Sequence, residues 1–576
     1  MPLRGSVQKT IETETVAEAY LTLLAERGID ILFANGGTDF APIVEAAAAI
    51  QAKGTKPALR IIPVGHENVA ASAAHGYYLR TGRPAAVMFH VNVGTANGIN
   101  ALANAARDQI PMLFTAGRNP LTEQGRRGSR DTGIHWGQEM FDQAGMVREL
   151  CKWDYELRDG DQLEQVVDRA LEIMTSEPCG PVYLSLPREV LSAPMTRFSF
   201  ASPPRRGFGT VPGPDRQAIE RAAALIAAAE RPLVFARANG RLAANAAALQ
   251  SFVERFALPL VEYRAMTNSL PSDHPCLVGY DPLPHLKEAD AVISIESDVP
   301  WIPVRQGNPP DEAKHIHIGV DPLFARVPIR SYPCDQAVTG PPHSVLPLLA
   351  EALQARIAPG AIEARRAQLA AQQKKTAQDG AAHIAKHETA TPIHPIWATH
   401  CIARVRPDDA ILVNEYPLIS RYAPFPMPRT YYGTPSGGGL GWGLGAAIGM
   451  KIAEPERLVI ATLGDGAYMF GNPTAGHQLL RALDLPMLFI IFNNAMWEEV
   501  ERAALAVFPD GHAARMNRVP VAHLGPAAHY EHMMKIYDGH GERVDRPEAL
   551  PGALARALEA VKAGRQALLN LIVGHR

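Results

Sequence analysis

Two polar residues that follow apolar runs suggest a cation site in the last third of the chain. Asp465 stands between Gly464 and Gly466 at the end of RLVIATLGDG, and Asn494 ends LPMLFIIFNN. Carboxylate and amide oxygens are hard ligands suited to Mg²⁺ or Ca²⁺. Because Mg²⁺ takes few protein ligands and completes its shell with water and phosphate, the pair predicts a phosphorylated cofactor. A plain structural turn explains Gly-Asp-Gly equally well.

The apolar runs that carry these residues predict buried strands of parallel sheets. Such runs alternate with Ala- and Leu-rich helical patterns throughout the chain: IDILFAN, RPAAVMFHV, IPMLFTAG, RPLVFAR, ADAVISIES, KHIHIGV, DAILVNE, RLVIATLGDG and LPMLFIIFNN. Continuous apolar strands separated by helices indicate α/β sheets covered on both faces. Ligands bind outside the carboxyl ends of such strands. A helix predicted over about Thr474 to Asp484 would join two neighbouring strands, so that Asp465 and Asn494 reach the same crevice.

The length of the chain predicts about three domains. At 576 residues the chain exceeds one ordinary hydrophobic core. A stretch rich in Pro, Gly and Arg, Leu191 to Pro214, reads as a connector, and an Ala/Gln/Lys-rich stretch, Ala358 to Gly380, reads as a linker helix with a thin apolar stripe. We therefore expect three consecutive α/β domains with parallel sheets flanked by helices, over residues 8–190, 213–353 and 390–576.

Composition excludes several classes of protein. A net charge of −3 gives no basic face for nucleic acid. Five scattered cysteines without a CxxC pair indicate free buried thiols, not a disulfide framework or a thiolate metal site. The N-terminus is polar where a signal peptide needs an apolar core, and no apolar run approaches the roughly 20 residues of a membrane span. We expect a cytoplasmic protein with no membrane or nucleic-acid partner.

A glycine-rich segment, SGGGLGWGLGAAIG at Ser436 to Gly449, raises a nicotinamide-binding alternative. A dinucleotide fingerprint should follow a strand directly and precede an acid that binds ribose about 20 residues later. Here PRTYYGTP precedes the glycines, and the Gly-Asp-Gly sequence stands where the acid should be. These departures disfavour the nicotinamide interpretation.

Two separate segments carry a resemblance to a known family. GGGLGWGLGAAIGMKIAEPERLVIATLGDG, with the interval ending in Asn-Asn, resembles the diphosphate-binding segment of thiamine diphosphate (ThDP) dependent enzymes of the acetolactate synthase and benzoylformate decarboxylase group. Val64 to Gly117 resembles the pyrimidine-binding domain of the same group. The resemblance covers essentially the whole chain and implies the domain order pyrimidine-binding, middle, diphosphate-binding.

The resemblance implies roles for individual residues. Glu67 matches the glutamate that hydrogen-bonds N1′ of the aminopyrimidine and so promotes loss of the C2 proton. Leu440 matches the bulky residue that holds the cofactor bent. The implied Mg²⁺ ligands are Asp465, Asn494 and the backbone carbonyl of Met496. Further cofactor contacts are implied at Asn414, Glu415, Gly438, Gly439, Gly464, Gly466, Ala467 and Trp497.

The substrate side of the site is less sharply implied. His90 matches a histidine of the benzoylformate decarboxylase pattern and is suited to relaying protons near neutral pH. Thr38 matches a small hydroxyl position, and His135 with Gln138 resembles a pocket-facing loop of acetolactate synthases. Each also fits an ordinary structural role.

Departures from the family pattern put some contacts in doubt. Pro417 and Leu418 replace small hydroxyl residues, and Trp301 stands where the decarboxylase pattern places a histidine. Glu498 and Glu499 follow the metal loop, either as pocket residues or as solvated helix acids. The middle domain lacks a glycine-rich turn, so we expect no FAD.

The implied activity is cleavage or formation of a carbon–carbon bond next to a carbonyl, by a 2-oxo acid decarboxylase or an acetolactate synthase-like carboligase that acts on a small 2-oxo acid or aldehyde. A 2-hydroxyacyl-CoA or oxalyl-CoA lyase, and a catalytically silent cofactor-binding protein, are the alternatives. The resemblance also implies a homodimer or dimer of dimers, in which Glu67 and Asp465 of one site belong to different subunits. The Ala-rich segments Val69 to His75 and Leu444 to Ala453 are candidates for the interface helices.

Overall fold

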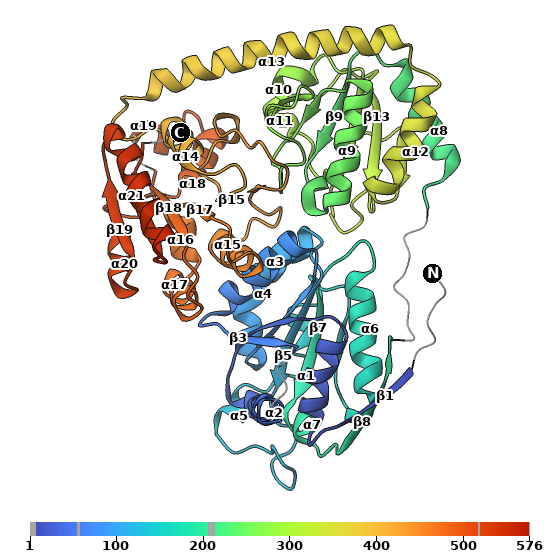
Figure 1. Cartoon of the computed structure of the whole chain (residues 1–576), viewed down its shortest axis with the longest axis vertical. Helices are drawn as coiled ribbons and strands as arrows, with labels where there is room; N and C mark the ends of the chain where they lie inside the picture. Colours follow the sequence, from blue (N-terminus) through green and yellow to red (C-terminus); the bar gives the residue numbers. More distant parts are fainter. Residues whose placement is uncertain (1–6, 54–57, 205–212, 517–518, 575–576) are drawn as a thin grey trace. The chain divides into compact units, whose positions relative to one another are not determined.

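The computed structural model describes residues 7–53, 58–204, 213–516 and 519–574 and contains three six-stranded parallel sheets (Figure 1). Helices flank each sheet, and the sheets follow one another along the chain. This arrangement confirms the predicted α/β fold of three consecutive domains. The domain limits themselves remain a prediction.

The N-terminal sheet has the strand order β3-β2-β4-β5-β7-β6. Its strands are β2 (Ile31–Asn35), β3 (Arg60–Pro63), β4 (Ala85–Phe89), β5 (Met112–Arg118), β6 (Asp154–Glu156) and β7 (Val182–Pro187). Its main helices are α1 (Val16–Glu26), α2 (Ala41–Ala52), α3 (Glu67–Thr81), α4 (Val91–Arg107) and α6 (Leu163–Thr175), with the short α5 (Ile134–Gly137), α7 (Arg188–Ser192) and the 3₁₀ turn η1 (Thr38–Phe40). Every residue of β4 is buried, as expected of a central strand covered on both faces.

The middle sheet has the order β11-β10-β9-β12-β13-β14. Its strands are β9 (Pro232–Ala236), β10 (Leu260–Val261), β11 (Leu277–Gly279), β12 (Ala291–Ile295), β13 (Lys314–Gly319) and β14 (Gln336–Thr339). Helices α8 (Arg216–Ala228), α9 (Ala243–Phe256) and α12 (Pro342–Gln354) close its core.

The C-terminal sheet has the order β16-β15-β17-β18-β20-β19. Its strands are β15 (Ile411–Glu415), β16 (Tyr431–Tyr432), β17 (Val459–Gly464), β18 (Leu488–Asn493), β19 (His540–Val544) and β20 (Ala567–Ile572). The helices of this region are α14 (Pro395–Val405), α15 (Trp442–Ala453), α16 (Asp465–Phe470), α17 (Pro473–Ala482), α18 (Glu498–Val507), α19 (His512–Met516), α20 (Met533–Ile536) and α21 (Leu550–Lys562). All nine apolar runs identified in the sequence contain a strand, and α17 is the predicted connecting helix.

The first predicted linker is partly wrong. Within Leu191 to Pro214, strand β8 (Arg197–Ser202) pairs antiparallel with β1 (Val7–Glu12). Phe198 and Phe200 alternate with exposed residues and pack into the core of the N-terminal domain. Arg and Ser at the alternate positions hid this two-residue period. Residues 205–212 of the predicted linker lie outside the described residues.

The second linker is the predicted helix. Helix α13 (Pro359–His387) extends between the middle and C-terminal sheets (Figure 1), and only Ile362 and Leu369 of its residues are buried. No single helix among the described residues is long and apolar enough to span a membrane; the bent pair α12 and α13, at 119°, meets the length and composition test. All five cysteines are free, and Cys334 is exposed, contrary to the expectation that all are buried.

The chain forms two compact units that do not follow the three sheets. One unit combines residues 1–210 with 435–453 and 471–483, and the other contains the remaining residues. Helix α15 therefore belongs with α3, where Gly76 lies so close to α15 that an added Cβ would stand 2.1 Å from the Ala446 carbonyl oxygen. The two Ala-rich helices that are candidates for a subunit interface thus pack on each other within one chain, and their part in an interface stays a prediction.

The close approach of α3 and α15 predicts the effect of a single methyl group. Gly76→Ala should destabilise the protein by about 1–3 kcal/mol, since the helix backbones must separate to admit the methyl. The matched control is Gly380→Ala, inside the exposed helix α13, where an added Cβ meets nothing within 4 Å. Thermal unfolding should show a lower midpoint for Gly76→Ala and no loss for Gly380→Ala. Equal midpoints for the two variants would contradict the observed packing.

Candidate active site

The predicted site residues form two groups, one in each compact unit. In one unit, Asp465 begins α16 directly after β17, and Asn494 directly follows β18. Strands β17 and β18 are parallel neighbours, with Gly464 paired to Phe492. The two side chains therefore lie at the same edge of the sheet, as the sequence predicted.

Asp465 is a buried carboxylate held by backbone amides. Its Oδ1 accepts from Gly466 N at 2.8 Å, and its Oδ2 accepts from Ala495 N at 2.8 Å. Burial nevertheless raises the pKa of Asp465 to about 6, because desolvation penalises the charged form more than the amides stabilise it. A divalent cation would offset that penalty, so the donor set fits one.

Asn494 is oriented for oxygen coordination. Its Nδ2 donates to Glu498 Oε2 at 3.0 Å, and its Oδ1 accepts from Met496 N at 3.2 Å. Glu498 thus fixes which end of the amide faces the loop, whereas Glu499 is an exposed acid paired with Arg502. Of the two adjacent acids, Glu498 contacts a site residue and Glu499 is a solvated helix acid.

Trp497 determines the shape of the loop around Asp465. A Cβ added at Gly466 would stand 2.2 Å from the Trp497 ring, so only glycine fits beneath it. Trp497 N donates to Ala522 O at 2.7 Å, which ties the loop to the segment that follows α19. Ala467, one position beyond Gly466, is buried. The predicted cofactor residues Gly464, Gly466, Ala467, Met496 and Trp497 therefore surround Asp465 and Asn494 along this edge of the sheet.

The side chain of Asn414 is engaged within the protein, and its predicted cofactor contact stays a prediction. Its Nδ2 donates to Leu418 O and the Tyr431 hydroxyl, and its Oδ1 accepts from Leu418 N and the Thr462 hydroxyl. These bonds use both donors and both lone pairs of the amide. The side chain therefore holds the turn after β15, where Leu418 is buried, and Glu415 beside it is buried as well.

In the other unit, Glu67 is the first residue of α3 and is nearly buried. Its Oε2 accepts from Asn97 Nδ2 at 3.2 Å. Asn100 Nδ2 then bridges Asn68 Oδ1, at 3.0 Å, and the Leu440 carbonyl, at 2.9 Å. The loop that carries Leu440 is thus held beside the start of the helix that carries Glu67.

Two asparagines that the sequence interpretation missed anchor this loop. Asn104 exchanges hydrogen bonds with Gly439, donating to its carbonyl at 2.8 Å and accepting from its amide at 2.9 Å. Gly438, with φ of +66°, has the left-handed conformation that glycine tolerates. Asn100 and Asn104 are four residues apart on α4, and that spacing was the available signal.

The four predicted pocket residues lie together with one that the sequence interpretation missed. His90 Nδ1 lies 2.5 Å from Asp39 Oδ1, and Gln138 Nε2 lies 3.3 Å from His90 Nε2. Thr38 Oγ1 lies 3.3 Å from His135 Nε2. Asp39, next to Thr38 in the sequence, was not recognised because a single acid in a loop carries no periodic signal.

The Asp39–His90 pair has almost no room to move. A Cβ at Gly37 would stand 2.2 Å from His90 Nδ1, and a Cβ at Gly117 would stand 1.7 Å from Asp39 Oδ2. Asp39 accepts the Nδ1 proton, which leaves His90 Nε2 facing Gln138. Gln138 Oε1 is buried without a hydrogen-bond partner in the described part of the chain. If the amide rotated by half a turn, Oε1 would face His90 and could accept a hydrogen bond from a protonated His90 Nε2.

The two pocket histidines are biased in opposite directions. The hydrogen bond that His90 donates to Asp39 raises the pKa of His90 against the effect of burial, and the charges of Asp39 and Glu67 add to the rise. Burial lowers the pKa of His135, whose Nδ1 accepts from Asp131 N at 3.3 Å. Since Nδ1 accepts this bond, the neutral form of His135 carries its proton on Nε2, which lies 3.3 Å from Thr38 Oγ1.

Trp301 in the middle domain is a core residue and does not replace a histidine relay. It is fully buried, donates from Nε1 to Asn308 Oδ1 at 3.2 Å, and contacts Tyr332 edge to face with ring centroids 4.7 Å apart. Phe235 of β9 lies against its other side.

Comparison with known proteins identifies three matching regions. Residues 14–146 match the family model "Thiamine pyrophosphate enzyme, N-terminal TPP binding domain", residues 219–349 match its central domain, and residues 415–571 match its C-terminal TPP binding domain. Together these matches cover most of the chain, in the order of the three sheets.

Individual relatives extend along most of the chain. A probable 2-ketoarginine decarboxylase of Pseudomonas aeruginosa is 28% identical over 84% of this chain and 83% of its own. An acetolactate synthase large subunit of Mycobacterium tuberculosis is 25% identical over 95% of this chain and 94% of its own. The solved structure of a ThDP-dependent 4-hydroxybenzoylformate decarboxylase from Rhodococcus jostii superposes with a TM-score of 0.76 at 20% identity, covering 98% and 99% of the two chains, and shows the shared fold.

The Asp39–His90 geometry predicts a titration. Asp39→Asn should lower the pKa of His90, because an amide cannot stabilise imidazolium as a carboxylate does, while Glu67 alone continues to raise it. ¹⁵N-histidine NMR of the protein across the neutral range would follow both ring nitrogens. The exposed His512 serves as the internal control, because the charge of Asp39 also acts on the pKa of His135. An unchanged His90 titration in Asp39→Asn would show that Asp39 does not govern it.

Proposed function

This chain belongs to the thiamine pyrophosphate enzyme family, and from that premise we propose that it uses ThDP and Mg²⁺ to cleave or form a carbon–carbon bond next to a carbonyl. The observation that carries the proposal is the set of groups around Glu67. The charge of the buried Glu67, at the start of α3, raises the pKa of His90, whose contact with Asp39 fixes its tautomer. A second histidine, His135, lies 3.3 Å from Thr38, the neighbour of Asp39, and burial lowers its pKa.

The residues around Asp465 fit the metal end of the cofactor. Asp465, the Asn494 amide oxygen and the Met496 carbonyl would hold Mg²⁺ against the diphosphate, and Gly466 would allow close approach of backbone amides. At the other end, Glu67 would bind N1′ of the pyrimidine. When bound, ThDP supplies a nucleophilic thiazolium carbon and accepts the electrons released as the neighbouring bond breaks.

The chain's own side chains supply the proton transfers. Glu67 would share a proton with N1′ of a bound cofactor. Asp39 holds the proton on His90 Nδ1, so that His90 gains or loses a proton at Nε2. The amide of Gln138 can donate to Nε2 when it is unprotonated and accept from it when it is protonated. His135 donates to Thr38, whose hydroxyl proton then points to a substrate oxygen. Two imidazoles biased toward opposite protonation states suit one donor and one acceptor.

The substrate that we propose is a 2-oxo acid, decarboxylated directly or joined to an acceptor carbonyl. Similarity to a decarboxylase supports direct decarboxylation, and similarity to an acetolactate synthase supports joining to an acceptor after the same bond is cleaved. The presence of Glu67, Asp465 and Asn494 disfavours a silent cofactor-binding protein. An acyl-CoA substrate is the remaining alternative. We further propose that the middle domain binds no flavin.

A substrate panel tests this function. With ThDP and Mg²⁺ present, the enzyme should release CO₂ from at least one member of a panel of arylic, aliphatic and guanidino 2-oxo acids. Addition of an acceptor aldehyde distinguishes ligation, since carbon then appears in a larger product. Oxalyl-CoA and a 2-hydroxyacyl-CoA form the control arm. Turnover of the CoA esters alone would replace the proposed function with the lyase alternative.

Glu67 has a separate test. Glu67→Gln should keep ThDP binding, because size and metal contacts are unchanged, yet slow exchange of the cofactor C2 proton about 100-fold or more, because an amide cannot share a proton with N1′. Deuterium exchange measured by NMR on the bound cofactor reports this step without turnover. Exchange at the wild-type rate would remove Glu67 from the activating role.

We also propose an assembly of at least two chains. Large apolar side chains are exposed after β5 and on or beside α18 and need cover; they are Ile134, Trp136, Phe141, Val500, Val507 and Phe508. Because α3 and α15 cover each other, these other surfaces are the candidates for a subunit interface. The family resemblance supports the proposal that Glu67 and Asp465 of one site belong to different chains.

Mixing two inactive variants tests the shared site. When Glu67→Gln and Asp465→Ala chains exchange subunits, a mixed dimer has one site with both lesions and one with neither, so activity should return to up to about half of that of a wild-type dimer. Homodimers of each variant, treated identically, are the controls. Absence of recovery after proven exchange would mean that each site is built within one chain.

A further inference from the structure

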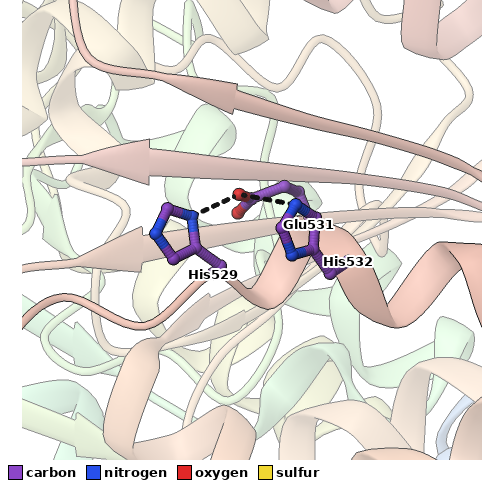
Figure 2. Close-up of side chains that lie close together, drawn as sticks. All are labelled: His529, Glu531 and His532. Atoms are coloured by element: carbon purple, nitrogen blue, oxygen red, sulfur yellow. Dashed lines mark hydrogen bonds and ion pairs between the residues drawn. The ribbon is translucent and has the colours of Figure 1, made fainter.

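A second group of possible metal ligands lies apart from the residues assigned to the ThDP site. Figure 2 shows His529, Glu531 and His532 converging, on the 3₁₀ turn η6 (Tyr530–His532) and the residue before it. His529 Nδ1 lies 2.8 Å from Glu531 Oε1, and His532 Nε2 lies 3.9 Å from the same oxygen. One ligand atom from each residue lies within 4.8 Å of the others.

The carboxylate of this group is fixed from behind by buried amides. Glu531 is buried, and its Oε2 accepts from Asn570 Nδ2 at 2.6 Å. Asn570, on β20, accepts in turn from Asn493 Nδ2 at 3.0 Å. Both asparagines also donate to the carbonyl of Ala528, which anchors the start of the turn. Glu531 Oε1 is therefore held toward the two imidazoles.

The histidines complete a set with an open side. Their rings stack 12° from parallel, with centroids 5.4 Å apart, and both side chains are more than half exposed. We propose that His529, Glu531 and His532 bind a divalent transition-metal ion of the Zn²⁺ type, with water at the open positions. Two imidazoles and one carboxylate suit Zn²⁺, Ni²⁺ or Cu²⁺, whereas Mg²⁺ prefers oxygen ligands alone.

The spacing is compatible with tetrahedral binding. Zn–ligand bonds of about 2.0–2.2 Å place neighbouring ligand atoms roughly 3.3 Å apart. The two observed separations, 2.8 and 3.9 Å, lie on either side of that value, so small side-chain rotations suffice. The amide of Asn570 supplies the outer hydrogen bond that orients a ligating carboxylate.

A simple ion pair is the competing explanation, and it accounts for less. Protonated His529 and Glu531 would form a satisfied pair on their own. The pair gives no reason for the second imidazole to stack on the first and turn Nε2 toward the same oxygen. A metal ion uses all three groups.

The turn η6 contacts segments next to Asp465 and Asn494, so a metal bound there would affect their rigidity. Tyr530, between the ligands, packs edge to face against Tyr468 of α16, with ring centroids 5.3 Å apart. Asn493, which supports the carboxylate through Asn570, immediately precedes Asn494. A metal at this turn would therefore brace the segments that carry Asp465 and Asn494.

Zinc counting tests the proposal. Full-length protein saturated with ThDP and MgCl₂ is dialysed to equilibrium against ZnCl₂, and bound zinc is counted per chain. Wild type should hold one more zinc than His529→Ala and one more than His532→Ala, while His512→Ala, an exposed histidine on α19, should match wild type. Equal zinc in wild type and the first two variants overturns the site.

A second measurement keeps the result independent of the proposed function. The same loss of one zinc should persist when all variants carry Asp465→Ala, because the two sites share no ligand. Substitution of Co²⁺ should give a visible absorption band in wild type and His512→Ala that disappears in His529→Ala. Both ligand histidines are exposed, so circular dichroism of the metal-free variants should equal that of wild type; a band that survives in His529→Ala would assign the metal elsewhere.

Discussion

The structure depends on a buried carboxylate at the end of two parallel strands. Removing Asp465 from water disfavours its charge, and the pKa of about 6 reports that cost even after two amides have met the oxygens. The register of β17 against β18 places the Asn494 amide beside the carboxylate. The Trp497 ring packs so closely on Gly466 that it restricts the conformation of the loop. A bound cation would stabilise a carboxylate held in this way, and the proposed binding of Mg²⁺ and ThDP rests on this residue.

The other compact unit also contains a buried carboxylate, and there a histidine side chain provides the contact that stabilises it. Asp39 is buried, and its carboxylate is satisfied by the Nδ1 proton of His90. Glycines at 37 and 117 allow that contact, because any larger residue would fill the space of the pair. At His135 burial outweighs the nearby carboxylate of Asp131, and the pKa of its imidazole is lowered. The pKa values of the two imidazoles are thus shifted in opposite directions, upward at His90 by the contact with Asp39 and downward at His135 by burial.

The sequence predicted the parts of this arrangement that rest on a repeated pattern of apolar residues. Nine apolar runs became strands because their hydrophobic residues are consecutive, and the positions of Asp465 and Asn494 followed from those runs. Strand β8 escaped recognition because its period of two is carried by two phenylalanines alone. The roles of Asp39 and Asn414 depend on residues distant in sequence, such as Gly117 and Tyr431, and no local pattern announces such partners. The packing of α3 on α15 likewise joins segments more than 350 residues apart.

The most direct test of the account is calorimetric titration of ThDP into the protein with Mg²⁺ present. Wild type and Asp510→Ala, an exposed aspartate outside the site, should bind one ThDP per chain with equal affinity. Asp465→Ala should show no measurable binding, since loss of the carboxylate removes the link between Mg²⁺ and the diphosphate. Equal ThDP affinity in Asp465→Ala and wild type would contradict the claim that this buried carboxylate organises the site.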